Sequence, residues 1–344
     1  MKIWIDARIY DDGIYYRAYV DELIEAFAKI NTEHTIVVYR ESDFPKNILP
    51  YVKDVQIKKL FEAEKLWLLI CFDVPTPVWY SWDAFIIIES LKEVFFPKKK
   101  FISRKLYKHT LQKSIAHSQK AIVMDTQTAL ELNEQLNVSE NKIEKIHWFF
   151  PKLNISTHSS LETDIKLKHN LKWEYLIYDS GNELHHNFER ILRAIKKISD
   201  SWVILSIIIL CDDTIQDLDI RSKALEYGIS QNIIFLWAAP QELEASYYKQ
   251  AAWVIFSSIY ESFPFSFSKA LHYNVPIFAN DINSIKEVMW KSIYYLDPLS
   301  LYGMTDIIIW GLSKWQTPDY SHLHDIFNSA QSAKELMRLV EMKN

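Results

Sequence analysis

Glycine is scarce in this chain, which has five glycines in 344 residues, whereas a usual share of about 7% predicts roughly two dozen. Cysteine is scarce too. Cys71 and Cys211 each lie in or beside an apolar, strand-like run, and they form neither a disulfide framework nor a metal-ligand spacing. The cysteine usage favours a reducing, cytoplasmic compartment. We expect no metal and no bound cofactor.

Long apolar runs are also missing. The longest, Trp202 to Cys211, has half of the ~20 residues that a membrane span needs. The N-terminal sequence MKIWIDAR reads as a strand and not as a signal peptide, so we expect a protein that neither crosses a membrane nor is exported. The net charge of -5 argues against a general nucleic-acid binder.

Length and periodicity predict a two-domain α/β protein. Charged residues make up 24% and hydrophobic ones 49%, close to globular averages, and the length exceeds what one core usually organises. Strand and helix patterns alternate in two successive runs, as in parallel sheets covered on both faces. The predicted strands are 2–8, 34–39, 66–72, 85–88, 121–125, 175–178, 203–210, 233–236, 254–256, 276–279 and 293–296. Between the runs, the polar and aperiodic segment 151–172 is predicted to be the linker.

The segment from Val254 to Pro298 holds the strongest candidate site. A short strand ends at Phe256, Glu261 opens a loop, and a helix carrying Lys269 follows. In such a crossover, free backbone N–H groups attract phosphate, and a carboxylate can accept hydrogen bonds from sugar hydroxyls. In the alternative interpretation, Glu261 is a helix-start carboxylate and the nearby phenylalanines are core residues.

This segment resembles the family 4 (group 1) glycosyltransferases of the GT-B fold, whose usual pattern is S-x-x-E-G-F-G-x-x-x-x-E-A-x-x-x-G-x-P. Matches to it stand at Ser258, Glu261, Phe263, Ala270 and Pro276, and the resemblance runs from KIWIDAR through YLIYDSGNELHHNFERILRAI to LDP. It implies two Rossmann-like domains facing each other across a cleft. Residues 1–155 would bind the acceptor, residues 165–320 would bind the donor, and a helix at about 322–344 would pack back on the first domain.

The resemblance also implies an activity. The enzyme would be a hexosyltransferase that moves a sugar from a nucleotide-diphosphate sugar to a glycan or lipid-linked acceptor in surface polysaccharide synthesis, with retention and without a metal. Glu261 would hold the donor sugar, and the backbone amides of Ser262 and Phe263 would hold the diphosphate. Around the nucleotide, the family pattern places Asn182, His186, Asn187 and Lys269.

Several family positions are substituted. Asn182 stands at the usual Arg and His186 at the usual Lys. Arg190 and Arg193 follow on a helix and are candidates to replace these cations, although a solvated helix face is the simpler and favoured interpretation. Lys269 replaces a glutamate that holds ribose hydroxyls, and lysine cannot accept a hydrogen bond. The substitutions support a competing hypothesis, a non-catalytic nucleotide- or glycan-binding relative. A sugar-nucleotide epimerase is a third.

The N-terminal half offers two further candidates. Gly13, in DDGIYY, stands in the family's glycine-rich turn, although Tyr15 replaces a second glycine. Glu89, in IIIESL, stands where the family has a histidine. Its carboxylate can accept a hydrogen bond from the transferring sugar, and a helix-cap role is the alternative.

A basic segment, 95–120, lacks acidic residues although the chain as a whole is acidic. Aromatic residues interleave with its cations, as in proteins that dock on an anionic membrane or a lipid-diphosphate acceptor, which would place the protein at the inner face of the membrane. A solvated basic helix is the alternative. The cations of this patch are Lys98, Lys99, Lys100, Arg104, Lys105 and Lys108.

Tryptophan is abundant where glycine is scarce, with 12 tryptophans against five glycines. Trp4, Trp237 and Trp290 fall where the resembling family has glycine, and an indole does not fit a tight turn. We hypothesise that the source organism reads UGA as glycine and that the chain was translated with tryptophan at those codons. Trp237 and Trp290 are then expected to be strained, exposed or poorly packed. The alternative is an aromatic-rich core.

Overall fold

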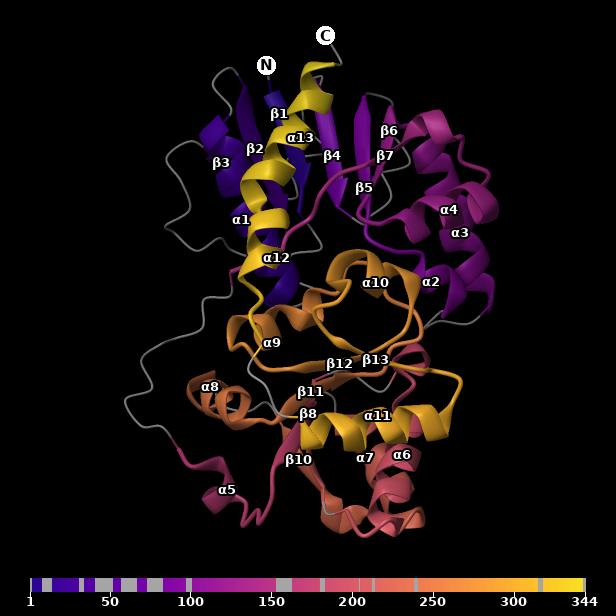
Figure 1. Ribbon diagram of the computed structural model, residues 1–344. Helices are drawn as coiled ribbons and strands as arrows, with labels where there is room; N and C mark the ends of the chain where they lie inside the picture. The colour runs from indigo at the N-terminus through magenta and orange to yellow at the C-terminus, as the bar shows by residue number, and fades with distance from the viewer. Residues whose placement is uncertain are drawn as a thin grey trace. The chain divides into compact units, whose positions relative to one another are not determined.

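The computed structural model describes residues 2–7, 14–30, 34–40, 52–56, 67–72, 83–96, 101–152, 163–179, 183–203, 205–211, 214–237, 241–314 and 318–342. The chain divides into two compact units (Figure 1). Unit 1 comprises Met1–Leu153 and Leu323–Asn344, and unit 2 comprises Asn154–His322. Each unit is a parallel sheet covered by helices, so the predicted α/β class with two Rossmann-like domains is confirmed.

Unit 1 contains a seven-stranded parallel sheet in the order β3-β2-β1-β4-β5-β6-β7. Its strands are β1 (Lys2–Asp6), β2 (Thr35–Arg40), β3 (Val52–Gln56), β4 (Leu68–Phe72), β5 (Ala84–Ile88), β6 (Lys120–Val123) and β7 (Ile143–Lys145). The helices are α1 (Ile14–Ile30), α2 (Lys92–Phe95), α3 (Phe101–His117), α4 (Thr126–Leu136), α12 (Ser321–Ile326, which begins in unit 2) and α13 (Ser329–Glu341). The C-terminal helix α13 packs against α1, beside which it lies in Figure 1.

Unit 2 contains a six-stranded parallel sheet in the order β10-β9-β8-β11-β12-β13. Its strands are β8 (Tyr175–Tyr178), β9 (Ser206–Cys211), β10 (Ile233–Trp237), β11 (Trp253–Phe256), β12 (Ile277–Asn280) and β13 (Tyr294–Leu296). The helices are α5 (Ile165–Lys168), α6 (Phe188–Asp200), α7 (Thr214–Glu226), α8 (Gln241–Gln250), α9 (Ser268–His272), α10 (Asn283–Met289) and α11 (Leu301–Ser313). Figure 1 shows α9 and α10 on one side of the sheet and α6, α7 and α11 on the other.

Burial explains why the central strands were predictable. Every residue of β4, β5, β8, β11 and β12 is buried, which is the pattern of strands covered on both faces. The strands that the sequence did not predict, β3 and β7, lie at the two edges of the first sheet. The segment Val52–Gln56 carries Lys53 and Asp54, so it lacks the apolar run that marks a central strand.

Helix α5 corrects the expected linker. It lies inside the segment 151–172, and its Ile165 is fully buried. Asp164 caps it by accepting a hydrogen bond from the backbone N–H of Leu167, at 2.9 Å. Part of the predicted linker is therefore packed in unit 2, while residues 153–162 lie outside the described residues.

The core of unit 2 is tight where α11 crosses the sheet. A Cβ atom added at Gly311 would come 2.4 Å from Cζ of Phe278, a fully buried ring that stacks on Trp253. Real contacts are never that short, so the ring would have to move. This glycine lies in a helix because the space beside it is already filled.

We therefore predict that Gly311→Ala lowers the free energy of unfolding by about 1–3 kcal/mol, the usual cost of overpacking. Chemical denaturation measures the effect. Helix propensity alone predicts the opposite sign, a gain of about 1 kcal/mol. A stabilised variant would therefore show that the ring moves freely. The double variant Gly311→Ala with Phe278→Leu, which shortens the opposing side chain, should recover part of the loss.

The three tryptophans at family glycine positions behave differently. Trp290 has a backbone φ of +41° and a side chain that is 71% exposed, so the expectation of strain and exposure is confirmed there. Trp4 is buried in β1, with its indole N–H among the buried groups that lack a hydrogen-bond partner in the described part of the chain. The side chain of Trp237 lies outside what the structure describes.

Candidate functional site

The strand order of unit 2 locates a ligand crevice. From β8 the chain moves outward through β9 and β10, and it then returns to place β11 on the other side of β8. In open parallel sheets, ligands bind outside the carboxyl ends of the strands at such a reversal. The residues that emerge there are Asp179 after β8 and Ser257 and Ser258 after β11. The loop with Glu261 follows directly.

Hydrogen bonds hold the loops after β8 and β11 together. The hydroxyl of Ser257 donates to the carbonyl of His186, and the backbone N–H of Ile259 donates to the carbonyl of His185 at 2.8 Å. Asn280, at the end of β12, donates from Nδ2 to the carbonyls of Ser257 and Ser258. These are buried or half-buried contacts, so the rim of the crevice is fixed before any ligand arrives.

The Glu261 loop combines a partly exposed carboxylate with a buried frame. Glu261 is half-buried, and its carbonyl accepts a hydrogen bond from the Ser284 hydroxyl of α10. Ser262 and Phe263 are buried, and the 3-10 turn Phe265–Phe267 begins only after Pro264. Glu261 is therefore not in the first turn of a helix.

The alternative interpretation of the phenylalanines is nevertheless correct. Phe263, Phe265 and Phe267 are all buried, and Phe267 stacks on Phe256 of β11 with ring centroids 4.2 Å apart. The predicted helix is shorter than expected, since α9 has five residues. Its Lys269, Ala270 and Leu271 are buried. The same segment therefore supplies core on one side and the carboxylate loop on the other.

Lys269 lies in a cluster of opposite charges. Its Nζ is 3.1 Å from Oε2 of Glu244 on α8 and 3.4 Å from Oδ2 of Asp179, and all three side chains are less than one-fifth exposed. The Tyr248 hydroxyl donates to the same Asp179 carboxylate. Among the residues around it, Tyr273 has a pKa raised to about 12, first by burial and then by the Glu244 charge. Lys269 therefore forms ion pairs with two carboxylates.

The family pattern placed Lys269 at this site but missed Asp179, Glu244 and Tyr248. A signal for Asp179 was present, because it is the first polar residue after a buried strand, at the edge where ligands bind. Glu244 and Tyr248 lie in α8, whose sequence ELEASYYKQ gives no sign of which face meets Lys269. Asn182, predicted near the nucleotide, lies outside the described residues.

His186 and Asn187 lie where β8 leads into α6, in and after the 3-10 turn Leu184–His186. Both are half-buried, and Asn187 adopts a left-handed conformation with φ of +53°. Next to them, His185 is buried, with Nδ1 3.4 Å from Oε2 of Glu183. Glu183, His185 and His186 offer ligand atoms within 4.8 Å of one another and can hold a zinc-like ion.

Arg193 does not reach the crevice. Its guanidinium contacts Glu189 one turn away, at 2.5 Å, and the Tyr227 hydroxyl at 3.2 Å. These hydrogen bonds raise the pKa of Arg193. The side chain is 58% exposed, so the solvated-face interpretation is correct for this arginine.

In unit 1, Glu89 lies at the carboxyl end of β5, beside α1. Its carboxylate accepts a hydrogen bond from the Tyr16 hydroxyl, and its carbonyl lies 3.5 Å from the Thr128 hydroxyl. The N-cap of α2 is Leu91, so the helix-cap alternative for Glu89 is wrong. Gly13 lies outside the described residues.

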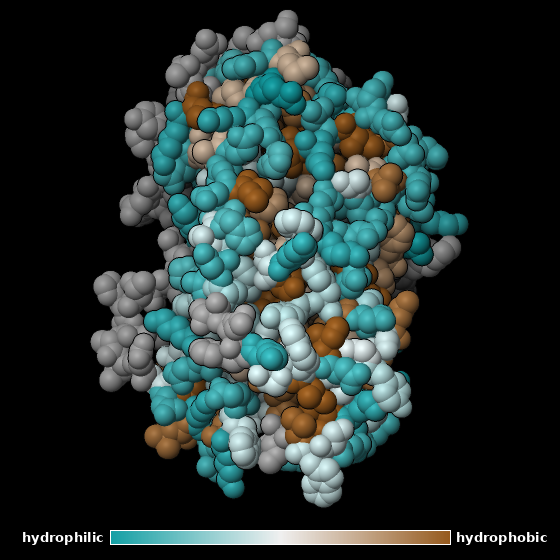
Figure 2. Space-filling model, in the orientation of Figure 1, coloured by the Kyte–Doolittle hydropathy of each residue, from teal (hydrophilic) through white to brown (hydrophobic). Residues whose placement is uncertain are grey.

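Part of the basic segment forms α3. Lys105 is exposed, Arg104 and Lys108 are half-buried, and the Leu106 side chain is 65% exposed between them. Lys98, Lys99 and Lys100 lie outside the described residues. In Figure 2, hydrophilic residues predominate over the surface that α3, α4 and α13 occupy in Figure 1, with small hydrophobic patches between them. Within the described ranges, no helix combines the length and apolar character of a membrane span.

Comparison with known proteins finds one matching family model and several similar folds. Residues 161–292 match the family model described as "Glycosyl transferases group 1". No curated protein matches the sequence significantly.

Solved structures match over nearly the whole chain. Sucrose-phosphate synthase from Thermosynechococcus elongatus is 13% identical, with 99% of this chain and 98% of that chain covered and a TM-score of 0.72. HepE from Anabaena, in complex with UDP and glucose, is 10% identical over 99% of this chain and 100% of its own, with a TM-score of 0.70. WaaG, a glycosyltransferase involved in lipopolysaccharide biosynthesis, is 12% identical, with 97% of this chain and 94% of that chain covered and a TM-score of 0.63. At these identities the likeness establishes the fold.

Proposed function

We propose that this chain transfers a sugar from a nucleotide-diphosphate donor. It resembles the group 1 glycosyltransferases of the GT-B fold in its sequence over residues 161–292 and in its fold throughout. The acceptor would be a glycan or a lipid-linked sugar in surface polysaccharide synthesis, and a hexose would be transferred with retention. The single observation that carries the proposal is the Glu261 loop, which lies at the strand-order reversal of unit 2. Of the neighbours, HepE binds UDP and glucose.

In this proposal, different residues bind the sugar, the diphosphate and the nucleotide of the donor. The Glu261 carboxylate accepts hydrogen bonds from the sugar hydroxyls, because an ionised carboxylate accepts strongly from O–H groups. The backbone N–H groups of Ser262 and Phe263 face the diphosphate, where the negative charge of the leaving group grows as the glycosidic bond stretches. Asn182, His186 and Asn187 contact the nucleotide. Because Ser284 and Asn280 hold the loop in place, little reorganisation accompanies binding.

The Asp179–Lys269–Glu244 cluster would bind the ribose of the nucleotide. The family's acceptor glutamate is missing at Lys269, but two carboxylates lie within 3.4 Å of its ammonium group. Their remaining lone pairs can accept from ribose hydroxyls, while Lys269 orients them. Glu89 of unit 1 accepts a hydrogen bond from the transferring sugar. No step requires a metal.

A non-catalytic relative is the second candidate. The observation in its favour is that Lys269 is already paired with two acids, so it adds no uncompensated positive charge for the leaving diphosphate. Such a protein would bind a nucleotide or a glycan without turning it over. A sugar-nucleotide epimerase would isomerise the donor with no acceptor present.

One experiment separates the three. The purified protein is incubated with UDP-, GDP- and ADP-sugars, and the products are identified by mass spectrometry and nucleotide release. Thermal shift with UDP, GDP and ADP measures binding in parallel. Release of nucleoside diphosphate supports the transferase, a shift in Tm without release supports the binding protein, and an isomerised sugar nucleotide supports the epimerase. If the protein neither binds nor turns over any of these ligands, all three candidate functions are contradicted.

We further propose that α3 docks on an anionic membrane that holds the acceptor. Its exposed face carries Lys105, with Arg104 and Lys108 beside it and Leu106 available to enter the interface. Each basic residue near such a surface contributes about 1 kcal/mol. The double variant Lys105→Gln and Lys108→Gln should therefore bind vesicles of mixed neutral and anionic lipid about 10- to 30-fold more weakly.

Vesicle co-sedimentation measures this prediction. The matched control neutralises Lys196 and Lys197, which lie on α6 in unit 2 and outside the basic segment. Equal binding by the α3 variant and the parent chain would show that α3 is a solvated basic helix.

A further inference from the structure

Two bulky side chains stand where the backbone is left-handed. Trp202 has φ of +63°, and Trp290 has φ of +41° with ψ of -108°. At positive φ, the Cβ atom of an L-residue crowds a neighbouring carbonyl, and glycine avoids the clash because it has no Cβ. For a bulky residue such a conformation is a genuine outlier.

Elsewhere in the described chain, left-handed positions carry the residues that tolerate them. Asparagine is the residue other than glycine that adopts this conformation most readily, because its short polar side chain bonds locally. The positions in question are Asn137, Asn170, Asn187, Asn274 and Gly228. The two tryptophans are therefore exceptions to a rule that this backbone otherwise follows.

Both exceptions end helices. After α6, the N–H of Trp202 donates to the carbonyl of Ser199 at 3.1 Å, and after α10 the N–H of Trp290 donates to the carbonyl of Lys286 at 3.0 Å. A left-handed residue just past a helix is usually glycine, because the chain must turn sharply while its N–H still bonds back to the last turn. Local structure at both positions thus favours glycine and disfavours tryptophan.

The contacts of the two indole rings do not explain why tryptophan occupies these left-handed positions. Trp202 is 94% exposed and Trp290 is 71% exposed, although tryptophan is highly buried on average. The Trp290 ring lies 4.9 Å from the Lys291 ammonium, a contact that is weak at an exposed site. By contrast, Trp148 is 2% exposed and stacks on Tyr19, with ring centroids 4.7 Å apart. Of these three tryptophans, Trp148 alone has the buried, ring-stacked setting that is usual for the residue.

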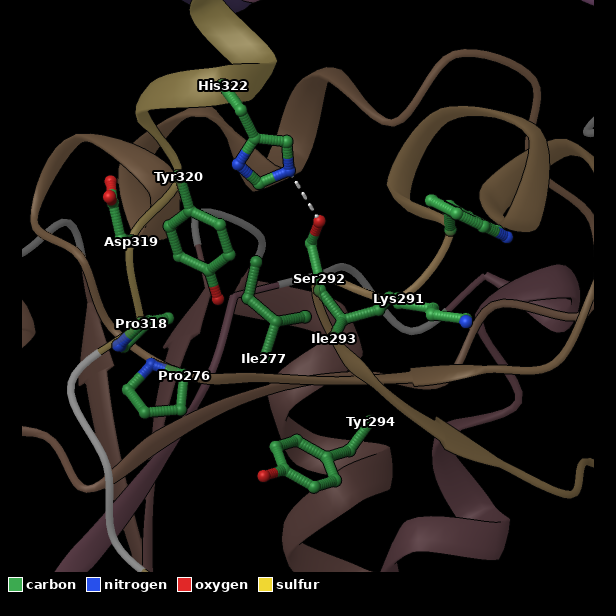
Figure 3. A pocket seen from close by; sticks show the side chains of 11 residues that line it. Pro276, Ile277, Lys291, Ser292, Ile293, Tyr294, Pro318, Asp319, Tyr320 and His322 are labelled. Carbon is green, nitrogen blue, oxygen red and sulfur yellow. Dashed lines mark hydrogen bonds between the residues drawn. The ribbon is translucent and has the colours of Figure 1, made fainter.

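Trp290 also lies away from the crevice. It borders a cavity of about 550 Å³ that Pro276 and Ile293 line at the amino ends of β12 and β13. Figure 3 shows this cavity, with the Ser292 hydroxyl 2.9 Å from Nε2 of His322 on its wall. The carboxyl ends of the strands, where Glu261 lies, are at the opposite edge. A role in donor binding therefore does not account for the indole.

We infer that the native polypeptide carries glycine at positions 202 and 290, because the two codons are UGA triplets that the source organism reads as glycine. The composition agrees, since 12 tryptophans and five glycines reverse the usual abundance of the two residues. Trp202 has no part in the family pattern. The backbone alone singles it out, and the inference does not depend on the proposed function.

The direct test is the mass of the peptides that span positions 202 and 290, from the protein purified from its own organism and digested. Glycine at both positions is the expected result, together with UGA at both codons in the genomic DNA. A tryptophan mass at either position, or a UGG codon there, overturns the inference.

A second test uses the tryptophan-containing chain made in a standard host. Trp202→Gly and Trp290→Gly should each raise the Tm by about 2–4 °C because each removes backbone strain. This is the usual Tm shift for about 1 kcal/mol in a domain of 150–250 residues. Trp202→Ala and Trp290→Ala are matched controls that remove the indole but keep the Cβ, so they should gain less. Trp148→Gly, which empties a filled core site, should lower the Tm. If alanine and glycine act equally at both positions, backbone strain is not the cause.

Discussion

Glu261→Gln should reduce kcat/KM for sugar transfer by about 10- to 100-fold, because a hydrogen bond to a charged group contributes about 1.5–3 kcal/mol. Glutamine keeps the size of the side chain, so the loop should keep its frame, in which the carbonyl of residue 261 accepts from Ser284. The loss should appear in the rate and not in the Tm. Initial rates with the donor identified by the product assay provide the measurement.

The matched control for this prediction is Glu226→Gln, at the exposed end of α7 in the same unit. It removes one carboxylate without touching the loops after β8 and β11. A Glu261→Gln protein that turns over donor as fast as the control would remove Glu261 from the proposed site. Loss of rate with a lowered Tm would instead mean that the carboxylate supports the fold.

Lys269→Met should lower the free energy of unfolding by about 3 kcal/mol, because breaking a buried ion pair leaves the partner charges uncompensated. The Lys269 side chain is 11% exposed, and the Asp179 and Glu244 carboxylates beside it are 16% and 17% exposed. Without the ammonium group, two carboxylates would face each other in a region with little water. Urea denaturation of the variant and the parent measures the difference.

Two controls identify the cause. Lys196→Met removes an ammonium group whose ion pair with Asp200 is largely exposed, so it should cost less than about 1 kcal/mol. Adding Asp179→Asn and Glu244→Gln to Lys269→Met removes the uncompensated charges and should recover most of the loss. If the triple variant is no more stable than the single one, lost packing explains the effect.

The fold was predictable where burial dictates the sequence. Runs such as YLIY in β8 and VIF in β11 are apolar because both faces of the strand are covered, and their predicted bounds agree with the structure to within a residue. The edge strand β7 was missed because it has three residues that are half-buried or exposed, and β3 was missed because Lys53 and Asp54 interrupt its apolar run. Helix α5 was missed because four residues are too few to show a helical period.

The site was predictable only in part, for a physical reason. A pattern along the sequence finds Glu261 and Lys269, which lie eight residues apart in one crossover. It does not find Asp179 and Glu244, which reach the Lys269 ammonium from two other elements. Lys269 looked like the loss of an acceptor, but in three dimensions it lies among acceptors. Trp202 was missed likewise, because only the backbone shows that its φ is positive.

The most direct test of the proposed function is to follow the release of nucleoside diphosphate from UDP-, GDP- and ADP-sugars by the purified protein. It should be run on the parent chain and on the double variant Trp202→Gly and Trp290→Gly, each with and without Glu261→Gln. A glycosyltransferase with its donor site at the carboxyl ends of β8 and β11 should release nucleoside diphosphate in a reaction that Glu261→Gln suppresses. Nucleotide binding without release, in all forms of the chain, would contradict a catalytic role and establish a binding protein on the same fold.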